Sequence, residues 1–424
     1  MVPTIVPLWI SELLLAVSIP PLLVYAVRLY LFSALSLRHG KPAPSIHRDD
    51  SRHMVSVIIP LFNKAVFVDR LMSKVTSFYG PDFEVIVADD SHDSSPEKLE
   101  KWREDPRVTA VYRPTRRGWK AGALNEAIKA VSLHSEYCLF LDADSVPEAD
   151  LLQRMVVRME ETGADVVQGA QQPDANDPQN WVSRGLALVL NGFNFVDLQA
   201  RKELGLLIPV TGSNFLIRTE LIKANPFHEN ASEDWELTAE LWSRGWKVVY
   251  APDIIVRGEA PDRVRGMLKR YALWSGSTTA DTVNLAGEIA RSRNLKRRVK
   301  LDFFLSGLSY LMSIFVILAV VGALLIPVPI FGRGSTPIIA GSAILAAFII
   351  PAAPISLLVA AHVSNTKRRL SSVLLAILGS LLVLPVVAYS SLKGLVRHGR
   401  PLNVKTDAGF VDVNEIEAES QDQA

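Results

Sequence analysis

The chain has 424 residues, of which 49% are hydrophobic, and its formal net charge is +1 at pH 7. An apolar share this high excludes a purely soluble enzyme of this size, and a net charge near zero gives no overall field that would attract nucleic acid. The single cysteine, Cys138, excludes a disulfide framework, which fits a soluble part in a reducing compartment.

The first apolar stretch predicts a transmembrane helix at residues 1–36. It is nearly uncharged from residue 5 to residue 35, longer than the roughly 20 residues that cross a bilayer. No basic region precedes it and no small-residue cleavage site follows it, which disfavours a cleaved signal peptide. Basic residues come next, so the positive-inside rule predicts an external N-terminus and a cytoplasmic chain from residue 40 onward. A polar linker is expected at 37–53.

Residues 54–258 change to a pattern in which strands alternate with helices. Strands are expected at 54–60, 83–90, 108–112, 137–141, 164–168, 210–218 and 246–250. Helices are expected at 65–77, 95–104, 122–132, 186–202 and 231–244, with a further helix start at Pro147. This alternation predicts a mostly parallel sheet with right-handed crossover connections.

Two of the expected strands end in carboxylate pairs, Asp89-Asp90 and Asp142-Ala-Asp144. Because open α/β sheets bind ligands beyond the carboxyl ends of their strands, both pairs can face one crevice. Two hard oxygen ligands suit Mg²⁺ or Mn²⁺ carrying a diphosphate. Taken alone, Asp142-Ala-Asp144 is better explained as an Asp-rich loop that caps the next helix, and Asp89-Asp90 is also explained as a turn-forming loop.

A third acidic pair, Glu233-Asp234, opens the helix expected at 231–244, with Ser232 as the expected N-cap residue. Acidic residues in a first helical turn are stabilised by the helix dipole, so the pair has a structural explanation as well as a catalytic one.

The segment 259–300 mixes basic, aromatic and small residues, which predicts amphipathic helices at the membrane surface. Apolar segments then predict about three transmembrane helices within 301–396, followed by a polar tail at 397–424. Three crossings would put Lys393 outside, against the positive-inside rule, if the basic run at 367–369 is cytoplasmic. Three crossings are the prediction. The conflict is resolved if one segment is re-entrant, if a longer segment folds as two, or if the tail is outside.

The acidic pairs, their order and the flanking apolar segments resemble the inverting glycosyltransferases of family 2, which have a GT-A catalytic domain. The likeness is greatest to the membrane-embedded branch of cellulose, mannan and hyaluronan synthases, and it covers 54–276. The matching motifs, in family order, are Val55–Asn63, Ala88-Asp89-Asp90-Ser91 with Asp93, Lys120–Asn125, Asp142-Ala-Asp144, Gln168, Gly212 and Glu233-Asp234. The resemblance implies an α/β GT-A domain (Rossmann-like, with a mostly parallel sheet) in the cytoplasm and an α-helical transmembrane domain. The stretch from Leu392 to Thr406 resembles a tail that is usually cytoplasmic in the mannan-synthase-like branch.

The resemblance also implies roles for individual residues. Asp234 would be the catalytic base, with Glu233 as the second choice, and Asp144 with Asp142 would hold Mg²⁺ or Mn²⁺. The residues implied in binding the donor nucleotide are Pro60, Asn63, Asp89, Asp90, Lys120, Gly122 and Asp142. Those implied in binding the acceptor are Gly212, Arg270 and Trp274.

One motif departs from the family pattern. The family's Gln-x-x-Arg-Trp is represented by Arg270-Tyr-Ala-Leu273-Trp274, so both the glutamine and the arginine are replaced. Processive members use this motif to contact the acceptor sugar and the diphosphate. The departure therefore puts processive polymer synthesis in doubt.

The sequence thus predicts a multi-pass cell-membrane enzyme with a cytoplasmic active site. It would transfer a sugar from a UDP- or GDP-linked donor to a growing polysaccharide and could translocate the product. One alternative is transfer of a single sugar to a polyprenyl phosphate or another lipid; the other is a catalytically inactive, nucleotide-sensing membrane subunit. The expected partners are the donor, a carbohydrate or lipid-linked acceptor and the bilayer, without nucleic acid; a homo-oligomer or an accessory subunit is left open.

Overall fold

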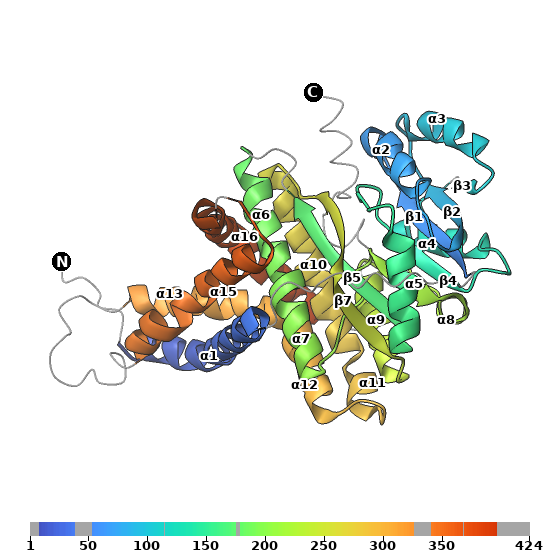
Figure 1. Cartoon of the computed structure of the whole chain (residues 1–424). Helices are drawn as coiled ribbons and strands as arrows, with labels where there is room; N and C mark the ends of the chain where they lie inside the picture. Colours follow the sequence, from blue (N-terminus) through green and yellow to red (C-terminus); the bar gives the residue numbers. More distant parts are fainter. Residues whose placement is uncertain are drawn as a thin grey trace.

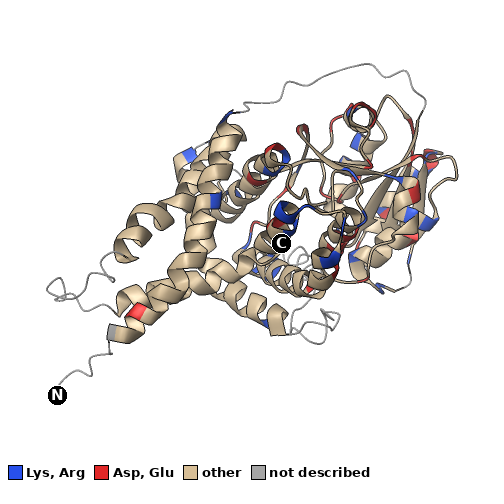
Figure 2. Ribbon diagram, turned by 90° about the horizontal axis from the view of Figure 1, so that it is seen from below, with Lys and Arg blue, Asp and Glu red and all other residues tan. Residues whose placement is uncertain are grey.

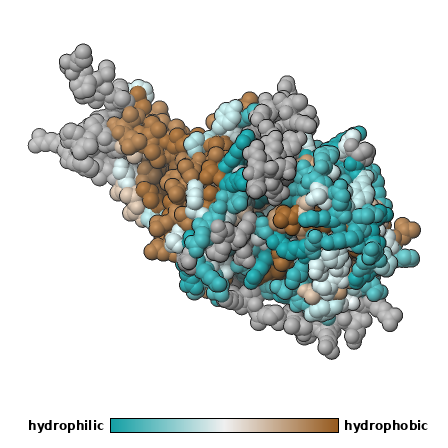
Figure 3. Space-filling model, turned by 90° about the horizontal axis from the view of Figure 1, so that it is seen from above, coloured by the Kyte–Doolittle hydropathy of each residue, from teal (hydrophilic) through white to brown (hydrophobic). Residues whose placement is uncertain are grey.

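The computed structural model describes residues 8–38, 53–113, 115–174, 179–325, 341–367 and 369–396. A sheet flanked by helices forms one end of the molecule, and a group of apolar helices forms the other (Figure 1). Charged residues gather at the sheet end (Figure 2), whereas apolar side chains cover the helical end (Figure 3). The predicted tail at 397–424 and most of the predicted linker lie outside the described residues.

The sheet has seven strands in the order β3-β2-β1-β4-β6-β5-β7. They are β1 (Met54–Leu61), β2 (Asp82–Asp89), β3 (Val108–Tyr112), β4 (Tyr137–Phe140), β5 (Val166–Asp174), β6 (Phe215–Arg218) and β7 (Val248–Glu259). Only the pairs that include β6 are antiparallel, so the prediction of a mostly parallel sheet is confirmed.

Helices cover both faces of the sheet, and an apolar core fills each face. Val57 and Ile58 of β1 are both fully buried and belong to different cores, as expected for a central parallel strand covered on both faces. The first core includes α2 (Ala65–Val75), α3 (Ser95–Glu100) and α5 (Leu151–Thr162). The second includes α4 (Trp119–Lys129), α8 (Thr219–Ala224) and α9 (Glu233–Ser243). A 3-10 turn, η1 (Lys101–Glu104), follows α3.

Several elements begin or end elsewhere than the sequence predicts. The strand expected at 210–218 shrinks to β6, because Gly212 and Asn214 have φ angles of +72° and +52° and form a turn. The helix expected from Pro147 begins at Leu151, because the nitrogen of Val146 instead donates to the carbonyl of Arg257 at 2.8 Å. The short helix α8 is not anticipated from the sequence.

The helix expected at 186–202 is three consecutive helices that begin earlier. They are α6 (Trp181–Asn191), the π-helix η2 (Gly192–Leu198) and α7 (Gln199–Leu204). The earlier start has a local cause, because the side chain of Asn180 accepts hydrogen bonds from the nitrogens of Val182 and Ser183 at 2.9 and 3.0 Å. Such an N-cap satisfies amide groups that have no partner within the helix.

The remaining helices form the apolar end and its border with the sheet. They are α1 (Leu8–Arg38), α10 (Val264–Asn284), α11 (Ala286–Arg291), α12 (Arg297–Gly307), η3 (Ser309–Leu311), α13 (Met312–Leu324), η5 (Leu345–Ile349), α15 (Ile350–Val363) and α16 (Arg369–Val396). By length and composition alone, three described helices could cross a membrane: Trp9–Arg38, Gly341–Val363 and Arg369–Val396. A fourth is added if α12 and Ser309–Leu324 together make one span. The two helices meet at a bend of 49°.

Buried ion pairs join the first apolar helix to the sheet end. Arg201 of α7 is 2% exposed and donates to the carboxylate of Asp302 at 2.6 Å. Arg28 of α1 reaches both Asp302, at 3.4 Å, and Asp197 of η2, at 3.2 Å. Because two arginines face two aspartates, the cluster carries no net charge and can be buried where these helices meet.

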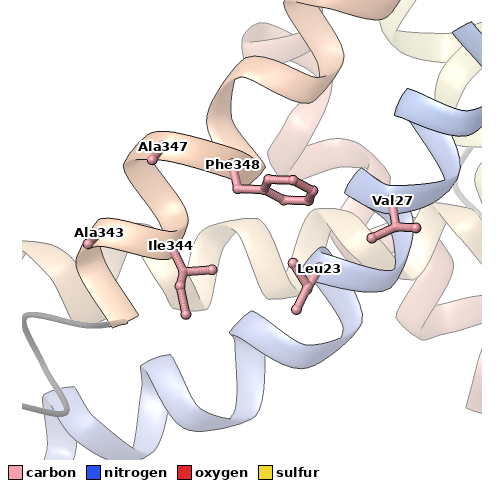
Figure 4. Close-up of a pocket in the computed structure, with 6 residues that line it drawn as sticks. All are labelled: Leu23, Val27, Ala343, Ile344, Ala347 and Phe348. Carbon is pink, nitrogen blue, oxygen red and sulfur yellow. The ribbon is translucent and has the colours of Figure 1, made fainter. Parts of the chain in front are cut away.

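A groove at the apolar end lies between α1 and the helix that begins at residue 341 (Figure 4). It is lined by Leu23, Val27, Ala343, Ile344, Ala347 and Phe348. None of these side chains offers a hydrogen bond to a sugar or a nucleotide, so the groove is not the candidate active site.

Candidate active site

The three acidic motifs come from different parts of the fold. Asp89 ends β2 and Asp142 follows β4, and both strands are parallel neighbours of β1. The two pairs therefore lie at the same edge of the sheet, where ligands bind in open α/β folds. Glu233 and Asp234 begin α9.

Lys120 connects these motifs through one ammonium group. Its Nζ donates to Oδ1 of Asp142 at 2.7 Å and to the carbonyl of Gly212 at 3.1 Å, and it lies 3.8 Å from Oε1 of Glu233. Burial by itself would lower the pKa of Lys120, but the surrounding carboxylates, Asp142 first, raise it above its usual value. Lys120 is therefore charged at neutral pH, and it lies in the first turn of α4 because that helix begins at Trp119.

Asp234 lies next to Lys120 across the turn at Gly212. A Cβ atom on Gly212 would be 3.2 Å from Nζ of Lys120 and 3.3 Å from Oδ2 of Asp234. Burial and the neighbouring charge of Glu233 raise the pKa of Asp234 to about 7. A carboxylate with a pKa near neutrality is well suited to accept a proton at that pH.

Ser232 stands at the N-cap position of α9, as predicted, but its side chain makes no capping hydrogen bond. Its hydroxyl instead donates to the buried carboxylate of Asp281 in α10. The indole nitrogen of Trp235 donates to Oγ1 of Thr282 at 2.9 Å. These two contacts attach the first turn of α9, and with it Asp234, to α10.

Asp142 and Asp144 fit a divalent cation by their chemistry. Burial, and then the negative charge of Asp142, raise the pKa of Asp144, so a cation beside the pair would relieve an unfavourable interaction. In the part of the chain that the structure describes, no third His, Cys, Asp or Glu joins them as a metal-ligand group. Mg²⁺ commonly takes one or two carboxylates from a protein and its remaining ligands from phosphates and water.

Arg270 belongs to the surroundings of Asp144 even though it lies on α10. Its charge, like that of Lys64, opposes the rise in the pKa of Asp144. Its guanidinium also lies 5.5 Å from the centre of the Trp274 ring. The structure thus brings the predicted residue Arg270 toward the acidic pair and adds Lys64, which the sequence did not single out.

The second acidic pair is surrounded by arginines. Asp90 is 4% exposed and lies 3.0 Å from Nε of Arg113 and 4.0 Å from Nε of Arg116. Burial outweighs these charges and raises the pKa of Asp90 to about 6. Neither arginine was singled out from the sequence; the only signal was the basic stretch from Arg113 to Arg117.

Several buried polar atoms at this pair lack a hydrogen-bond partner among the described residues. They include Oδ2 of Asp89 and Oδ1 of Asp90, which are acceptors, and Nη1 of Arg113, which is a donor. Oδ1 of Asp89 accepts from the nitrogen of Ser91 at 2.9 Å. An unpartnered buried acceptor such as Oδ2 of Asp89 suits a ligand that offers an N–H group, and uracil and guanine both have one.

The remaining predicted donor-site residues have defined packing positions. Pro60 lies within β1, and Oδ1 of Asn63 accepts from the nitrogen of His92 at 2.8 Å, joining the end of β1 to the loop after Asp90. A Cβ atom on Gly122 would lie 2.0 Å from the carbonyl of Arg117, so glycine lets the arginine-bearing loop pack on α4. Contact of these residues with a donor stays a prediction.

Gln168 holds the turn that contains Gly212. Its Oε1 accepts from the nitrogen of Thr211 at 2.9 Å, and its Nε2 donates to the carbonyl of Ser213 at 3.0 Å. Gln168 is fully buried, so it positions this turn through hydrogen bonds from within the sheet.

Comparison with known sequences gives one family and a set of relatives. Residues 56–225 match the family model described as "Glycosyl transferase family 2". Glucomannan 4-beta-mannosyltransferase 7 of Arabidopsis thaliana is 26% identical over 254 residues, which cover 57% of this chain and 46% of the relative. Glucomannan 4-beta-mannosyltransferase 1 of rice (Oryza sativa subsp. japonica) is 24% identical over 267 residues, 59% of this chain and 51% of the relative. The chain thus spans about half the length of the curated relatives it matches.

Among solved structures, the chain is similar to the mannosyltransferase PcManGT from Pyrobaculum calidifontis in complex with GDP-Man and Mn²⁺. The TM-score is 0.57 at 19% sequence identity, and the match covers 91% of this chain and 98% of that one. The likeness concerns the fold. With the family match, it confirms the predicted GT-A fold class.

Proposed function

Because residues 56–225 match the model of glycosyltransferase family 2, we propose that the protein transfers a sugar from a nucleotide-sugar donor to a glycan at a membrane, with inversion of the anomeric centre. The observation that carries this proposal is the placement of Asp142, Gly212 and Glu233 around Nζ of Lys120. Asp234 lies beside the same group. The fold thereby brings together the positive charge of Lys120, the carboxylate of Asp142 and the candidate base Asp234.

In the proposed reaction, Asp234 accepts the proton of the acceptor hydroxyl. The hydroxyl oxygen then forms a bond to the anomeric carbon, while the bond from that carbon to the diphosphate oxygen breaks and the nucleoside diphosphate leaves. Lys120, charged and next to Asp142, offsets the negative charge that grows on the leaving group. Attack opposite to the leaving group accounts for the inversion.

Asp142 and Asp144 would hold Mg²⁺ or Mn²⁺. When bound, such an ion stabilises negative charge on the departing diphosphate as a Lewis acid. The structural neighbour is in complex with Mn²⁺ and GDP-Man, which supports this assignment. The proposed role of the protein is to provide two oxygen ligands at the end of β4.

The names of the relatives support mannose as the transferred sugar. The curated relatives are glucomannan 4-beta-mannosyltransferases, and the similar solved structure contains GDP-Man. We therefore propose GDP-mannose as the donor and a β-linked mannan-type chain as the acceptor. One observation favours a second candidate, transfer of a single sugar to a polyprenyl phosphate, because Leu273 replaces the arginine of the family's Gln-x-x-Arg-Trp motif.

A panel of UDP- and GDP-sugars tests the donor. The purified full-length protein should release GDP from GDP-mannose faster than it releases nucleotide from any UDP-sugar in the panel, measured as free nucleotide in the presence of Mn²⁺. Preference for a UDP-sugar would contradict the donor assignment. Product size then separates the two acceptors, because a ladder of chains indicates polymer synthesis and one chloroform-soluble product indicates a lipid acceptor.

The pH dependence of turnover tests the proposed base. Because the pKa of Asp234 is raised to about 7, the carboxylate is deprotonated and competent above that pH and becomes protonated below it. The rate constant kcat/KM should therefore fall about tenfold for each pH unit below 7. The measurement is nucleotide release across the neutral range, with donor binding measured in parallel as the control. A profile without an inflection near 7 would contradict the assignment.

A further inference from the structure

The amino-terminal end of α16 rests on the sheet domain. Nη2 of Arg184 in α6 donates to the hydroxyls of Ser371 and Ser372 at 2.6 and 3.3 Å. Just before the helix, the carbonyl of Ser364 accepts from Nε2 of Gln172 in β5 at 3.2 Å. This end of α16 therefore lies on the same side of the membrane as the candidate active site.

The carboxyl end of α16 also lies against the border of that domain. A Cβ atom on Gly394 would be 2.3 Å from the carbonyl of Gly276 and 3.3 Å from the nitrogen of Ala280, both in α10. Ala280 precedes Asp281, whose carboxylate binds Ser232 beside the proposed base. The last turn of α16 is thus one helix away from the candidate active site.

The middle of α16 packs against the same two helices, α6 and α10. A Cβ atom on Gly185 of α6 would lie 2.8 Å from the carbonyl of Leu375, and one on Gly379 would lie 3.6 Å from Sδ of Met267 in α10. Val383 and Val387 belong to one buried cluster with Met267. In Figure 1, α16 lies beside α6 and next to α15.

These contacts conflict with a membrane-crossing orientation. A helix of 28 residues is about 42 Å long, which exceeds the roughly 30 Å of a hydrocarbon core, so a crossing would put its ends on opposite sides. Both ends of α16 instead contact α6 and α10, which are attached to one folded domain. We propose that α16 lies in the plane of the membrane interface, with its free face seated among the acyl chains of the leaflet next to the active site.

The two faces of α16 fit this placement. At 100° per residue, nine of the ten buried residues of α16 fall on one side of the helix and the exposed large apolar residues fall on the other. The small residues on the buried side include Ser372, Ala376, Gly379, Ser390 and Gly394, and Ala388 is the buried residue that falls on the leucine side. The exposed set is Leu370, Leu374, Leu378, Leu381, Leu382, Tyr389, Leu392, Leu395 and Val396. Small residues let the backbones of α16, α6 and α10 approach, and the leucine face needs an apolar partner.

The basic residues of α16 and the exposed apolar residues at this end of the molecule identify the lipid bilayer as that partner. Basic Arg369 and Lys393 lie near the two ends of α16, and the helix contains no acidic residue, a pattern that suits anionic lipid headgroups. Exposed apolar residues of α1 include Val24 and Leu31. Figure 3 shows a large hydrophobic surface at the helical end of the molecule. A lipid leaflet would cover both helices at once.

The placement changes the expected topology. The chain would cross the membrane three times, through α1, through α12 with α13, and through the helix at 341–363, and not four times. Lys393 and the carboxyl end of α16 would then lie on the active-site side. The conflict between three C-terminal crossings and the positive-inside rule disappears.

Variants with a single cysteine test on which side of the membrane α16 ends. In a Cys138→Ala background, Val396→Cys reports on the end of α16, Leu133→Cys on the sheet domain and Trp9→Cys on the start of α1; the three native side chains are 78%, 94% and 61% exposed. A membrane-impermeant maleimide is applied to sealed vesicles of both orientations. Val396→Cys should be labelled in the same vesicles as Leu133→Cys. Labelling together with Trp9→Cys would overturn the proposal.

Depth measurements test the in-plane orientation separately. Nitroxide labels at Leu370→Cys, Leu381→Cys and Tyr389→Cys should show the same shallow depth, measured by the accessibility of each label to oxygen and to a polar relaxant. A helix that crosses would place Leu381 deeper than both other positions by about 10 Å, and that result would overturn the proposal. All three positions are exposed, so folding is preserved, and neither measurement depends on the proposed reaction.

Discussion

Replacing Asp234 by asparagine is expected to lower kcat about 10³-fold while donor binding is retained. Asparagine keeps the size of the side chain and can still accept the hydrogen bond from the nitrogen of Trp235, at 2.8 Å in the native structure. It cannot take a proton from the acceptor hydroxyl at neutral pH. Nucleotide release measures kcat, and calorimetric titration with the donor measures binding.

Two further variants sharpen this test. Glu240→Gln removes a carboxylate from the same helix, one that pairs with Arg244 away from the site, and should leave kcat unchanged. Glu233→Gln removes the second candidate base, which lies 3.8 Å from Lys120 and should have the smaller effect on kcat. If Asp234→Asn abolishes donor binding, Asp234 is a structural residue. If Glu233→Gln has the larger effect on kcat alone, the base is Glu233.

Replacing Asp144 by asparagine is expected to abolish the Mn²⁺-dependent part of donor binding and to lower turnover by more than about 100-fold. Loss of residues that only orient a metal ligand costs 10- to 100-fold, and a direct ligand should cost at least the upper end. Electron paramagnetic resonance of Mn²⁺ with nucleoside diphosphate reports binding without any turnover.

A matched control lies four residues further along. Glu148→Gln changes an exposed carboxylate in the same loop and should leave Mn²⁺ binding unaltered. If Asp144→Asn binds Mn²⁺ with nucleoside diphosphate as the native protein does, the metal role of Asp144 is removed. Retained Mn²⁺-dependent turnover would lead to the same conclusion.

Much of the sheet and both acidic strand ends could be predicted from the sequence. The β1 and β4 segments are short apolar runs bounded by polar residues, and hydrophobic periodicity is a local property that the sequence displays directly. Because parallel strands point the same way, Asp89 and Asp142 were expected at one edge, as the structure has them. The antiparallel β6 was not expected, because its reversal depends on the turn at Gly212.

The arrangement around Lys120 could not be predicted from the residues alone. Asp142 and Gly212 lie 22 and 92 residues from Lys120 along the chain, and their hydrogen bonds form only when the sheet assembles. Ser232 is a second example. The local sequence favours a helix cap at this position, but in the tertiary structure its hydroxyl donates to Asp281, which lies 49 residues away. Side-chain partners at long range are set by packing, not by local propensity.

The sequence by itself determined the class of the protein: a mostly parallel α/β domain with acidic strand ends, joined to apolar helices. Only the tertiary structure decided which charges meet at Lys120, and that both ends of α16 contact the sheet side of the molecule. The physical reason is common to both. Apolar content and periodicity are carried by each segment, whereas the partner that covers a helix face or neutralises a charge belongs to another segment.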